Sequence, residues 1–427
     1  MTEDRKPVAI GPNSSSSEIV AAVERWVEEY VPTAWRTAAP DGHAAIRAVR
    51  TRAQYEAWYP VFAASGLAVA TWPVEYGGLD LPVAQARIVE NVLAPLNLGR
   101  LNPLGLNNAA SALFAHGTTA QRARFLPPIV RNEERWCQLF SEPGAGSDLA
   151  SLATRAERDG DQWALSGQKV WTTWADRSEY AICLARTDPH VPKRQGITYF
   201  VVDLRADGIE IRPLRHLGGE VEFSEVFLDA VRVPDDHRIG AVGDGWRVAG
   251  STLAGERQMV AGAGSGGVDR IGGTGMVSLL ERAQSLRRTG EPTVRQQLVA
   301  LYAEERIRAW TNLRVRSAVR SGATPGPAAS IGKVLQGSLN QRIQMLATDL
   351  LGPAAMAWGA TDVDGSGPAA WAASLPLEVR GMLRSRANTI EGGTTEVNKN
   401  VLGEKVLGLP REPDPFADRS WDEVPRS

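Results

Sequence analysis

The sequence changes from helix-like to strand-like patterning near residue 135 and back again near residue 237, and this change constrains the fold more than any other feature. The strand-like part opens with a hairpin signal, because runs typical of strands at 154–158 and 162–166 are separated by a turn at Asp159-Gly160. Further short runs rich in Val, Ile, Tyr and Phe lie between turn residues at 180–186, 198–204, 209–213 and 226–233. This pattern predicts a small β-barrel or sandwich in the middle of the chain.

Helical patterning fills the chain before residue 135. The serines at 14–17 offer helix caps, and Glu18 fits a capping box at the start of the first helix. Apolar residues then recur on one helical face, and alanine-rich helical sequence continues to about Glu134. Most apolar residues at such spacing belong to a core, so this part is expected to be a helical packing domain.

Helical spacing returns after Gly245, and it extends through a long run of leucines that ends at Leu350-Leu351. Four or five helices in this part predict a bundle. The expected fold class is therefore α+β, with four parts in order: an N-terminal α-helical domain over 1–134, a β-barrel domain over 135–236, a C-terminal four-helix bundle over 237–410 and a loosely held tail over 411–427.

Composition excludes several classes of partner. With a net charge of −2, nothing argues for nucleic acid or for an anionic membrane surface. No apolar run reaches the roughly 18 residues of a membrane span, and the N-terminus lacks the apolar core of a signal peptide. Cys137 and Cys183 have no metal or C-x-x-C spacing, and the histidines are scattered. The expectation is a cytoplasmic protein with two buried thiols and no metal site.

Two polar segments frame the predicted hairpin. The first is a glycine-containing loop at 141–148, and the second is an aromatic and hydroxyl cluster at 169–173. Serine and threonine can donate to or accept from ring heteroatoms, and tryptophan can cover one face of a ring. The two segments together predict a site for a flat cofactor with polar edges.

These segments also carry a family resemblance. Ser-Glu-Pro-Gly-Ala-Gly-Ser-Asp at 141–148, followed by Gly-Gln-Lys-Val-Trp-Thr-Thr at 167–173, resembles the flavin-binding core of the acyl-CoA dehydrogenase family. Trp-Pro-Val-Glu-Tyr-Gly-Gly at 72–78, Glu-Gly-Gly-Thr-Thr-Glu at 391–396 and Val-Leu-Gly at 406–408 fit the same family. The resemblance covers about residues 17–410. It implies FAD between the β domain and the C-terminal bundle, in a site that a neighbouring subunit completes.

The resemblance assigns the flavin contacts position by position. They are Ser141 beside the isoalloxazine edge, Ser147 near the pyrophosphate, Trp171 over the ring, Thr173 near N5 and O4 with Thr172 beside it, Gly352 where the family has a Gly-Gly pair, and Thr394 and Glu396 toward the adenosine-diphosphate end.

The reaction that the resemblance implies is α,β-desaturation of an acyl-CoA thioester. In the family, a carboxylate removes the α-proton while the β-hydrogen leaves as hydride to flavin N5. Hydrogen-bond donors to the thioester carbonyl and a desolvated base make that proton removable.

Two glutamates are candidates for the base. Glu256, just before Arg257 on the first long helix of the expected bundle, resembles the base of a subset of the family and is favoured. Glu391 is the alternative, but it lies one residue before the position that the base has in many members, and on a helix one residue rotates a side chain by roughly 100°. Gly392 at that position leaves room for a carboxylate or a bulky acyl chain, and a backbone N–H for the thioester oxygen. Arg257 is expected to bind substrate or to orient Glu256.

One departure from the family bears on the partners. The usual Arg-x-x-Phe-Gly motif is missing from 283–293. The sequence thereby resembles an actinobacterial catabolic branch that includes heteromeric enzymes acting on steroid side chains. Expected partners are an acyl-CoA substrate, with an acyl-carrier protein left open as carrier, and electron-transfer flavoprotein or a similar acceptor. The expected assembly is a homodimer or homotetramer, or a heterotetramer with a second acyl-CoA dehydrogenase subunit.

Two other functions stay open on the same scaffold. One is a flavin-dependent monooxygenase or oxidase, and the other is a non-catalytic subunit of a heteromeric acyl-CoA dehydrogenase. A G-x-G-x-x-G match at 262–267 follows no strand, so it predicts a small-residue helix face and not a dinucleotide site.

Overall fold

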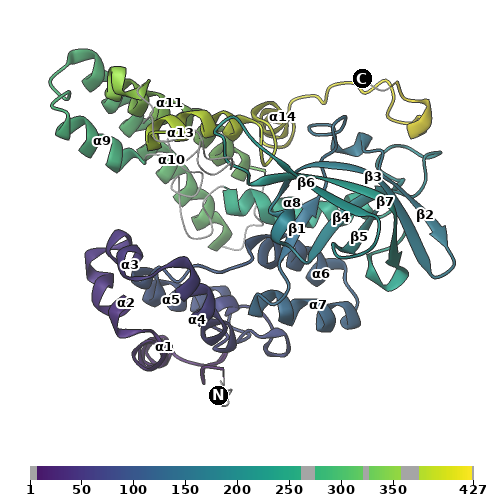
Figure 1. The fold of residues 1–427 in the computed structure, drawn as a ribbon, viewed down its shortest axis with the longest axis horizontal. Helices are drawn as coiled ribbons and strands as arrows, with labels where there is room; N and C mark the ends of the chain where they lie inside the picture. The colour runs from purple at the N-terminus through teal and green to yellow at the C-terminus, as the bar shows by residue number, and fades with distance from the viewer. Residues whose placement is uncertain (1–6, 261–274, 321–326, 357–374, 426–427) are drawn as a thin grey trace, which may run out of the picture.

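The computed structural model describes residues 7–260, 275–320, 327–356 and 375–425. Three parts follow one another along the chain: N-terminal helices, a β-sheet domain and C-terminal helices (Figure 1). The predicted α+β organisation is confirmed. The G-x-G-x-x-G match at 262–267 lies outside the described residues.

The N-terminal part is helical, and local capping explains where its helices begin. Ser15 caps the first helix and Glu18 closes the predicted capping box, and Thr51 and Thr118 make the same arrangement on α4 and α7. Buried apolar residues of α1, including Trp26, pack into the core of this part. The longer helices are α1 (Ser16–Tyr30), α2 (Thr33–Ala38), α3 (His43–Val49), α4 (Arg52–Ala64), α5 (Val83–Leu93), α6 (Ala110–His116) and α7 (Thr119–Arg131).

A tight glycine turn lies in the motif at 72–78, between α4 and α5. A Cβ at Gly78 would lie 2.1 Å from the carbonyl oxygen of Trp72, so only glycine fits there. That carbonyl also accepts a hydrogen bond from the N–H of Asp80 at 2.8 Å. The glycine therefore allows the chain to fold back closely upon itself before α5 begins.

The middle part is one sheet with strand order β6-β7-β3-β2-β4-β5-β8, and β1 pairs with β4 in parallel. The β2 and β4 strands meet only at Arg155 and Arg186, and buried residues from both halves of the sheet form one apolar core. The strands are β1 (Trp136–Leu139), β2 (Arg155–Asp159), β3 (Gln162–Thr173), β4 (Tyr180–Arg186), β5 (Ile197–Asp203), β6 (Ile209–Leu214), β7 (Phe223–Pro234) and β8 (Arg238–Ile239).

The predicted hairpin is confirmed. Strands β2 and β3 are antiparallel, with Asp159 opposite Gln162, so a two-residue turn joins them. Gly160 in this turn has a φ of +65°, which glycine adopts at little cost. The predicted run at 180–186 coincides with β4.

The C-terminal helices pack around α11, which contacts α8, α9, α10, α13 and α14. Their core is formed by apolar residues of α9, α10 and α11. The first helix of this part, α8, also contacts the β-sheet domain and the N-terminal helices. The Thr252 hydroxyl forms a hydrogen bond with the Tyr199 hydroxyl at 2.9 Å and donates to the carbonyl oxygen of Asn108 at 3.4 Å. The helices are α8 (Gly245–Val260), α9 (Met276–Ser285), α10 (Pro292–Arg320), α11 (Ala329–Leu351), α13 (Leu377–Ser385) and α14 (Thr395–Lys405).

The sequence analysis expected a loosely held tail over 411–427. In the structure, part of this segment is docked and not loose. It leaves α14, crosses to the β domain and ends beside it (Figure 1). A short 3-10 helix there, η12 (Trp421–Glu423), packs on the sheet domain, and Trp421 is only 9% exposed. Composition and charge predicted a tail, but a single aromatic residue far from the bundle gives the segment a buried contact.

Both cysteines are free and buried, as predicted. Burial raises the pKa of the Cys183 thiol to about 11, which keeps it protonated near neutral pH. Among the described residues, every helix is too short or too polar to cross a membrane.

Candidate functional site

The loop over residues 141–153 is held from beneath by a buried ion pair. The Glu142 carboxylate lies 2.8 Å from Lys169 Nζ, and the two side chains are 8% and 0% exposed. Glu142 also accepts from the backbone N–H groups of Ala153 (2.6 Å) and Thr154 (2.9 Å). Lys169 donates to the carbonyl oxygen of Leu184 at 2.8 Å. The pair therefore fixes both ends of the loop to the sheet.

The electrostatics of Glu142 favour its charged form. Burial by itself raises the pKa of the carboxyl group, but Lys169 and the N–H donors outweigh burial and lower the pKa below 4.5. A buried ion pair that is fully hydrogen-bonded is stable as a unit, and removing one partner leaves a charge without compensation.

The end of strand β3 carries three predicted cofactor residues in an irregular stretch. The register shifts between Lys169 and Thr172, and Trp171 has a φ of +60°. This bulge leaves Trp171 56% exposed, while Thr172 is buried and its Oγ1 has no hydrogen-bond partner among the described residues. The backbone also connects this strand to the loop, because the N–H of Val170 donates to the carbonyl of Ser141 at 2.9 Å. The structure thus places Ser141 beside Val170, the residue before Trp171.

The exposed Trp171 begins a chain of contacts that reaches the C-terminal helices. Its ring packs edge-on against Phe223 on β7, with centroids 5.7 Å apart. The guanidinium group of Arg384, on α13, lies over the Phe223 ring, 5.7 Å from its centroid. We call these three residues, with Glu222 and Glu391, the domain junction.

Arg384 joins two carboxylates at the domain junction. Its Nη2 lies 2.9 Å from Glu222 and 3.0 Å from Glu391, and its side chain is 17% exposed. Burial alone would lower the pKa of Arg384, but Glu391 and Glu222 outweigh burial and raise it. The Asn388 amide also donates to Glu391 at 2.9 Å. Glu391, the alternative base of the sequence analysis, is therefore already engaged by a cation and an amide.

A left-handed turn follows Glu391. Gly392 and Gly393 have φ values of +62° and +86°, which side chains rarely allow. Thr394 then caps α14, because its hydroxyl accepts from the N–H of Val397 at 3.1 Å. The turn directly follows Glu391 of the domain junction. The Glu-Gly-Gly-Thr motif at 391–394 and the segment at 169–173 therefore belong to one region.

The remaining predicted contacts are at the surface. Ser147 is exposed in the loop, Glu396 is exposed in the first turn of α14, and Gly352 ends α11 with a φ of +56°. None of the described contacts joins them to the domain junction. For Glu256 and Arg257 the structure describes the backbone as part of α8, and their side chains lie outside the described part.

One trio has ligand atoms close enough for a metal ion, within 4.8 Å: His216, Glu220 and Glu222. The hydrogen bonding argues against a metal there, because His216 Nδ1 accepts from the N–H of Gly218 at 2.9 Å. Its Nε2 lies 3.6 Å from the Glu220 carboxylate, which is too long for a hydrogen bond. Arg384 moreover lies 2.9 Å from Glu222, so one carboxylate of the trio is already paired with a cation.

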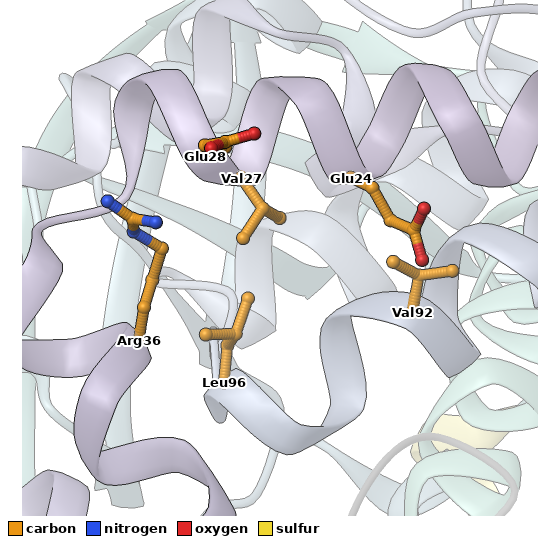
Figure 2. Close-up of a pocket in the computed structure, with 6 residues that line it drawn as sticks. All are labelled: Glu24, Val27, Glu28, Arg36, Val92 and Leu96. Carbon is orange, nitrogen blue, oxygen red and sulfur yellow. The ribbon is translucent and has the colours of Figure 1, made fainter.

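A cavity of about 320 Å³ lies elsewhere, on the N-terminal helices (Figure 2). It is bordered by α1, α2, α5 and the turn after α5, with two carboxylates and one guanidinium around apolar side chains. The predicted site residues are not among those that line it, which are Glu24, Val27, Glu28, Arg36, Val92 and Leu96.

The residues present fit a flavin. Thr172 offers a buried hydroxyl that has no partner within the described part of the chain, and its neighbour Trp171 offers an exposed aromatic ring. A Cβ placed on Gly144 or Gly146 would meet no atom within 4 Å, so the loop has open space next to its backbone. An aromatic face, a free hydroxyl and an open glycine loop suit a ring joined to a phosphate group.

The chain thus combines a helical domain, a β-sheet domain and a second helical domain, in that order. The chain belongs to the acyl-CoA dehydrogenase family, whose N-terminal, middle and C-terminal domain models match residues 14–133, 137–231 and 243–407. This confirms the family resemblance and the enzyme class. Members of this family are flavoproteins.

Similar proteins come from mycobacteria. The chain is 38% identical to acyl-CoA dehydrogenase IpdE1 of Mycobacterium tuberculosis, over 83% of this chain and 88% of that protein. It is 40% identical to acyl-CoA dehydrogenase FadE34 of the same organism, over 81% of this chain and 45% of that protein. These relatives support acyl-CoA dehydrogenation as the activity of the chain.

Similar solved structures include heteromeric assemblies. The Tcur3481-Tcur3483 steroid ACAD has a TM-score of 0.70 and 25% identity, over 93% of this chain and 98% of that one. The ChsE4-ChsE5 complex from Mycobacterium tuberculosis has a TM-score of 0.66 and 25% identity, over 94% and 100%.

Sequence reasoning gave no role to several residues that shape the site. For Lys169 the sequence did carry a signal. The alternation of β3 that turns Trp163 and Leu165 inward places Lys169 on the same inward face. A charged side chain on that face requires a partner of opposite charge. Arg384 had none, because its contacts with Glu222 and Phe223 join different domains.

Proposed function

We propose that this chain catalyses FAD-dependent α,β-desaturation of an acyl-CoA thioester. The observation that carries the proposal is the meeting of the 141–153 loop, the exposed Trp171 and the Glu391-Gly392 turn at one place in a chain of this family. FAD, when bound, supplies the hydride acceptor for the β-hydrogen. All other steps fall to the protein's own residues.

In this proposal Trp171 covers one face of the ring, and Ser141, Thr172 and Thr173 provide hydroxyl groups at its edge. Ser147 lies toward the phosphates, where open space beside Gly146 admits them. Gly352, Thr394 and Glu396 are proposed for the adenosine-diphosphate end. The hydroxyl of Thr394 already caps α14, so we expect that residue to contribute mainly by positioning the helix.

We assign the base to Glu256. It lies four residues after Thr252 on α8, and residues at that spacing share a helix face. Thr252 faces the place where α8 meets the other two domains. Glu391 is already engaged by Arg384 and Asn388, so its carboxylate oxygens are less free to reach a substrate. Gly392 leaves its backbone N–H for the thioester oxygen, and Arg257 orients Glu256 or binds substrate.

The proposed partners follow from the family branch. The two solved assemblies at 25% identity support a second type of subunit, and the protein named a steroid ACAD supports a bulky, ring-containing acyl group. An electron-transfer flavoprotein or a similar acceptor is proposed to reoxidise the enzyme. The free, buried cysteines agree with a reducing compartment such as the cytoplasm.

The test is an anaerobic titration of the purified protein with a panel of acyl-CoA thioesters, followed by the visible absorbance of oxidised flavin. We expect bleaching in the wild type and in Glu391→Gln, and a loss of at least about 10³-fold in bleaching rate in Glu256→Gln. Bleaching that survives in Glu256→Gln and disappears in Glu391→Gln would reverse the assignment of the base.

Other outcomes would favour the alternative functions. A yellow protein that no thioester bleaches, but that consumes oxygen once its flavin is reduced, would support the monooxygenase or oxidase. A colourless protein that gains flavin and activity only when mixed with a second acyl-CoA dehydrogenase subunit would support a heteromer.

A further inference from the structure

A buried arginine next to the loop over 141–153 donates hydrogen bonds to several backbone carbonyl groups. Arg186 at the end of β4 is 3% exposed. Its Nε donates to the carbonyl of Leu152 at 3.0 Å and its Nη2 to the carbonyl of Ala150 at 2.7 Å. Its Nη1 donates to the carbonyl of Lys193 at 3.0 Å. One side chain thus fixes the backbone of the loop at two places.

The C-terminal segment covers this arginine. The indole of Trp421 stacks on the Arg186 guanidinium, which lies 4.3 Å from the ring centroid. Its Nε1 donates to the carbonyl of Ser151 at 3.3 Å. Arg186 and Trp421 together therefore hold three successive carbonyl groups, those of Ala150, Ser151 and Leu152.

Backbone bonds keep Trp421 in place. Its N–H donates to the carbonyl of Val191 at 2.9 Å, and the N–H of Asp422 donates to the carbonyl of Pro189 at 3.1 Å. Ser420 forms a β-bridge with Pro192. The segment crosses to this position from α14 (Figure 1), so residues of the C-terminal part support a loop of the β domain.

The held carbonyl groups directly follow the part of the loop that is proposed to bind phosphates. Asp148 is fixed by Lys193, whose Nζ lies 2.8 Å from the carboxylate, and Arg186 fixes Lys193 in turn. Ser147 therefore stands between the buried Glu142 and a second anchor made of Arg186 and Trp421. A loop held at both ends loses less conformational freedom when it binds a ligand.

We propose that Trp421 is a positioning residue for the cofactor, acting through Arg186 to hold the 147–152 backbone in its flavin-binding shape. This inference rests on the proposed function, because it presupposes that the loop binds FAD. The C-terminal segment is then a functional strap of the site, although it lies outside the family's matched domains.

The test uses the full-length apo-protein, titrated with FAD and followed by quenching of flavin fluorescence. We expect Trp421→Ala to weaken FAD binding about 10-fold, and Trp421→Phe to restore most of the affinity because its ring can still cover Arg186. Hydrogen exchange followed by mass spectrometry should show faster exchange at 147–153 in Trp421→Ala, with unchanged exchange in the N-terminal helices.

The control is Phe416→Ala, an aromatic residue of the same segment that is 36% exposed and pairs only with Arg419 among the described aromatic contacts. It should change neither FAD affinity nor exchange at 147–153. Wild-type affinity and wild-type exchange in Trp421→Ala would overturn the strap. If the wild type binds no FAD even when mixed with a second acyl-CoA dehydrogenase subunit, the proposed function fails, and exchange at 147–153 in the apo-proteins then decides by itself whether Trp421 holds the loop.

Discussion

At the residue scale, one buried ion pair carries much of the local architecture. Glu142 and Lys169 are separated by 27 positions, and they hold the loop, β3 and β4 in one arrangement through charge-assisted hydrogen bonds. Because both side chains are out of solvent, each depends on the other for compensation of its charge. This makes the pair sensitive to substitution and to acid.

Glu142→Gln is expected to lower the free energy of unfolding by about 3–5 kcal/mol, because Lys169 keeps a buried charge without its partner. Urea denaturation at pH 7 measures the change. The matched control is Glu157→Gln on β2, whose ion pair with Arg155 is about two-thirds exposed and should matter by about 0–1 kcal/mol. Equal losses in the two variants would contradict the structural role of Glu142.

The same substitution should change the acid response. The pKa of Glu142 is lower in the folded protein than its ordinary 4.5. A carboxyl group of this kind adds stability above its unfolded pKa, and that stability is lost as the pH falls through the folded pKa. The difference between wild type and Glu142→Gln, measured as melting temperature, should therefore shrink below about pH 4.5.

A second carboxylate offers an independent pH test. Asp235 accepts from Trp163 Nε1 at 2.7 Å and from Arg238 Nε at 2.9 Å, and Arg238 followed by Trp163 lowers its pKa to about 2. Asp235→Asn should cost about 2 kcal/mol above pH 4, and the cost should vanish as the pH approaches 2. Melting curves between pH 2 and pH 7 test this, with Asp229→Asn as a control for the removal of one exposed carboxylate.

At the scale of elements, turns and caps decide where helices begin and how closely segments approach. The capping boxes of α1, α4 and α7 follow directly from short sequence patterns. Close approaches such as that of Gly78 to Trp72 depend instead on segments that only the folded chain brings together.

Gly78→Ala should lower the free energy of unfolding by roughly 1–3 kcal/mol, because the added methyl group has no room beside the Trp72 carbonyl. Gly250→Ala provides the matched control. Gly250 lies within α8 with open space where a Cβ would stand, so alanine should stabilise the helix by about 0.5–1 kcal/mol. Urea denaturation of both variants measures the signs, and a loss at Gly250 as large as that at Gly78 would contradict this account.

At the scale of the whole molecule, the domain junction couples the sheet to the C-terminal helices. Arg384 is 162 positions from Glu222, and it also contacts the Glu391 turn and the Phe223 ring. The proposed cofactor site lies at this junction, so coupling between the two domains should affect the site itself.

Arg384→Met should separate the unfolding of the β domain from that of the C-terminal helices, because two half-buried carboxylates lose their shared cation. Scanning calorimetry would then show a broadened or split transition. The control is Arg380→Met, whose contact with Glu220 is longer, at 3.4 Å, and more exposed. A single sharp transition in Arg384→Met, like that of the control, would show that the junction does not couple the domains.

The sequence by itself determined the order of domains, the β2–β3 hairpin, the first helix cap and the family. These depend on neighbouring residues, because helical and strand periodicity and turn chemistry are local properties. The sequence also identified the segments at 141–148, 169–173 and 391–396, because each is a short motif of consecutive residues.

Only the tertiary structure decided how these segments meet and what holds them. The engagement of Glu391 by Arg384 and the docking of Trp421 beside Ser151, 270 positions away, join parts of the chain with no local pattern in common. Such contacts depend on the packing of whole domains, and the composition of the C-terminal segment therefore predicted a loose tail where the fold makes a buried contact.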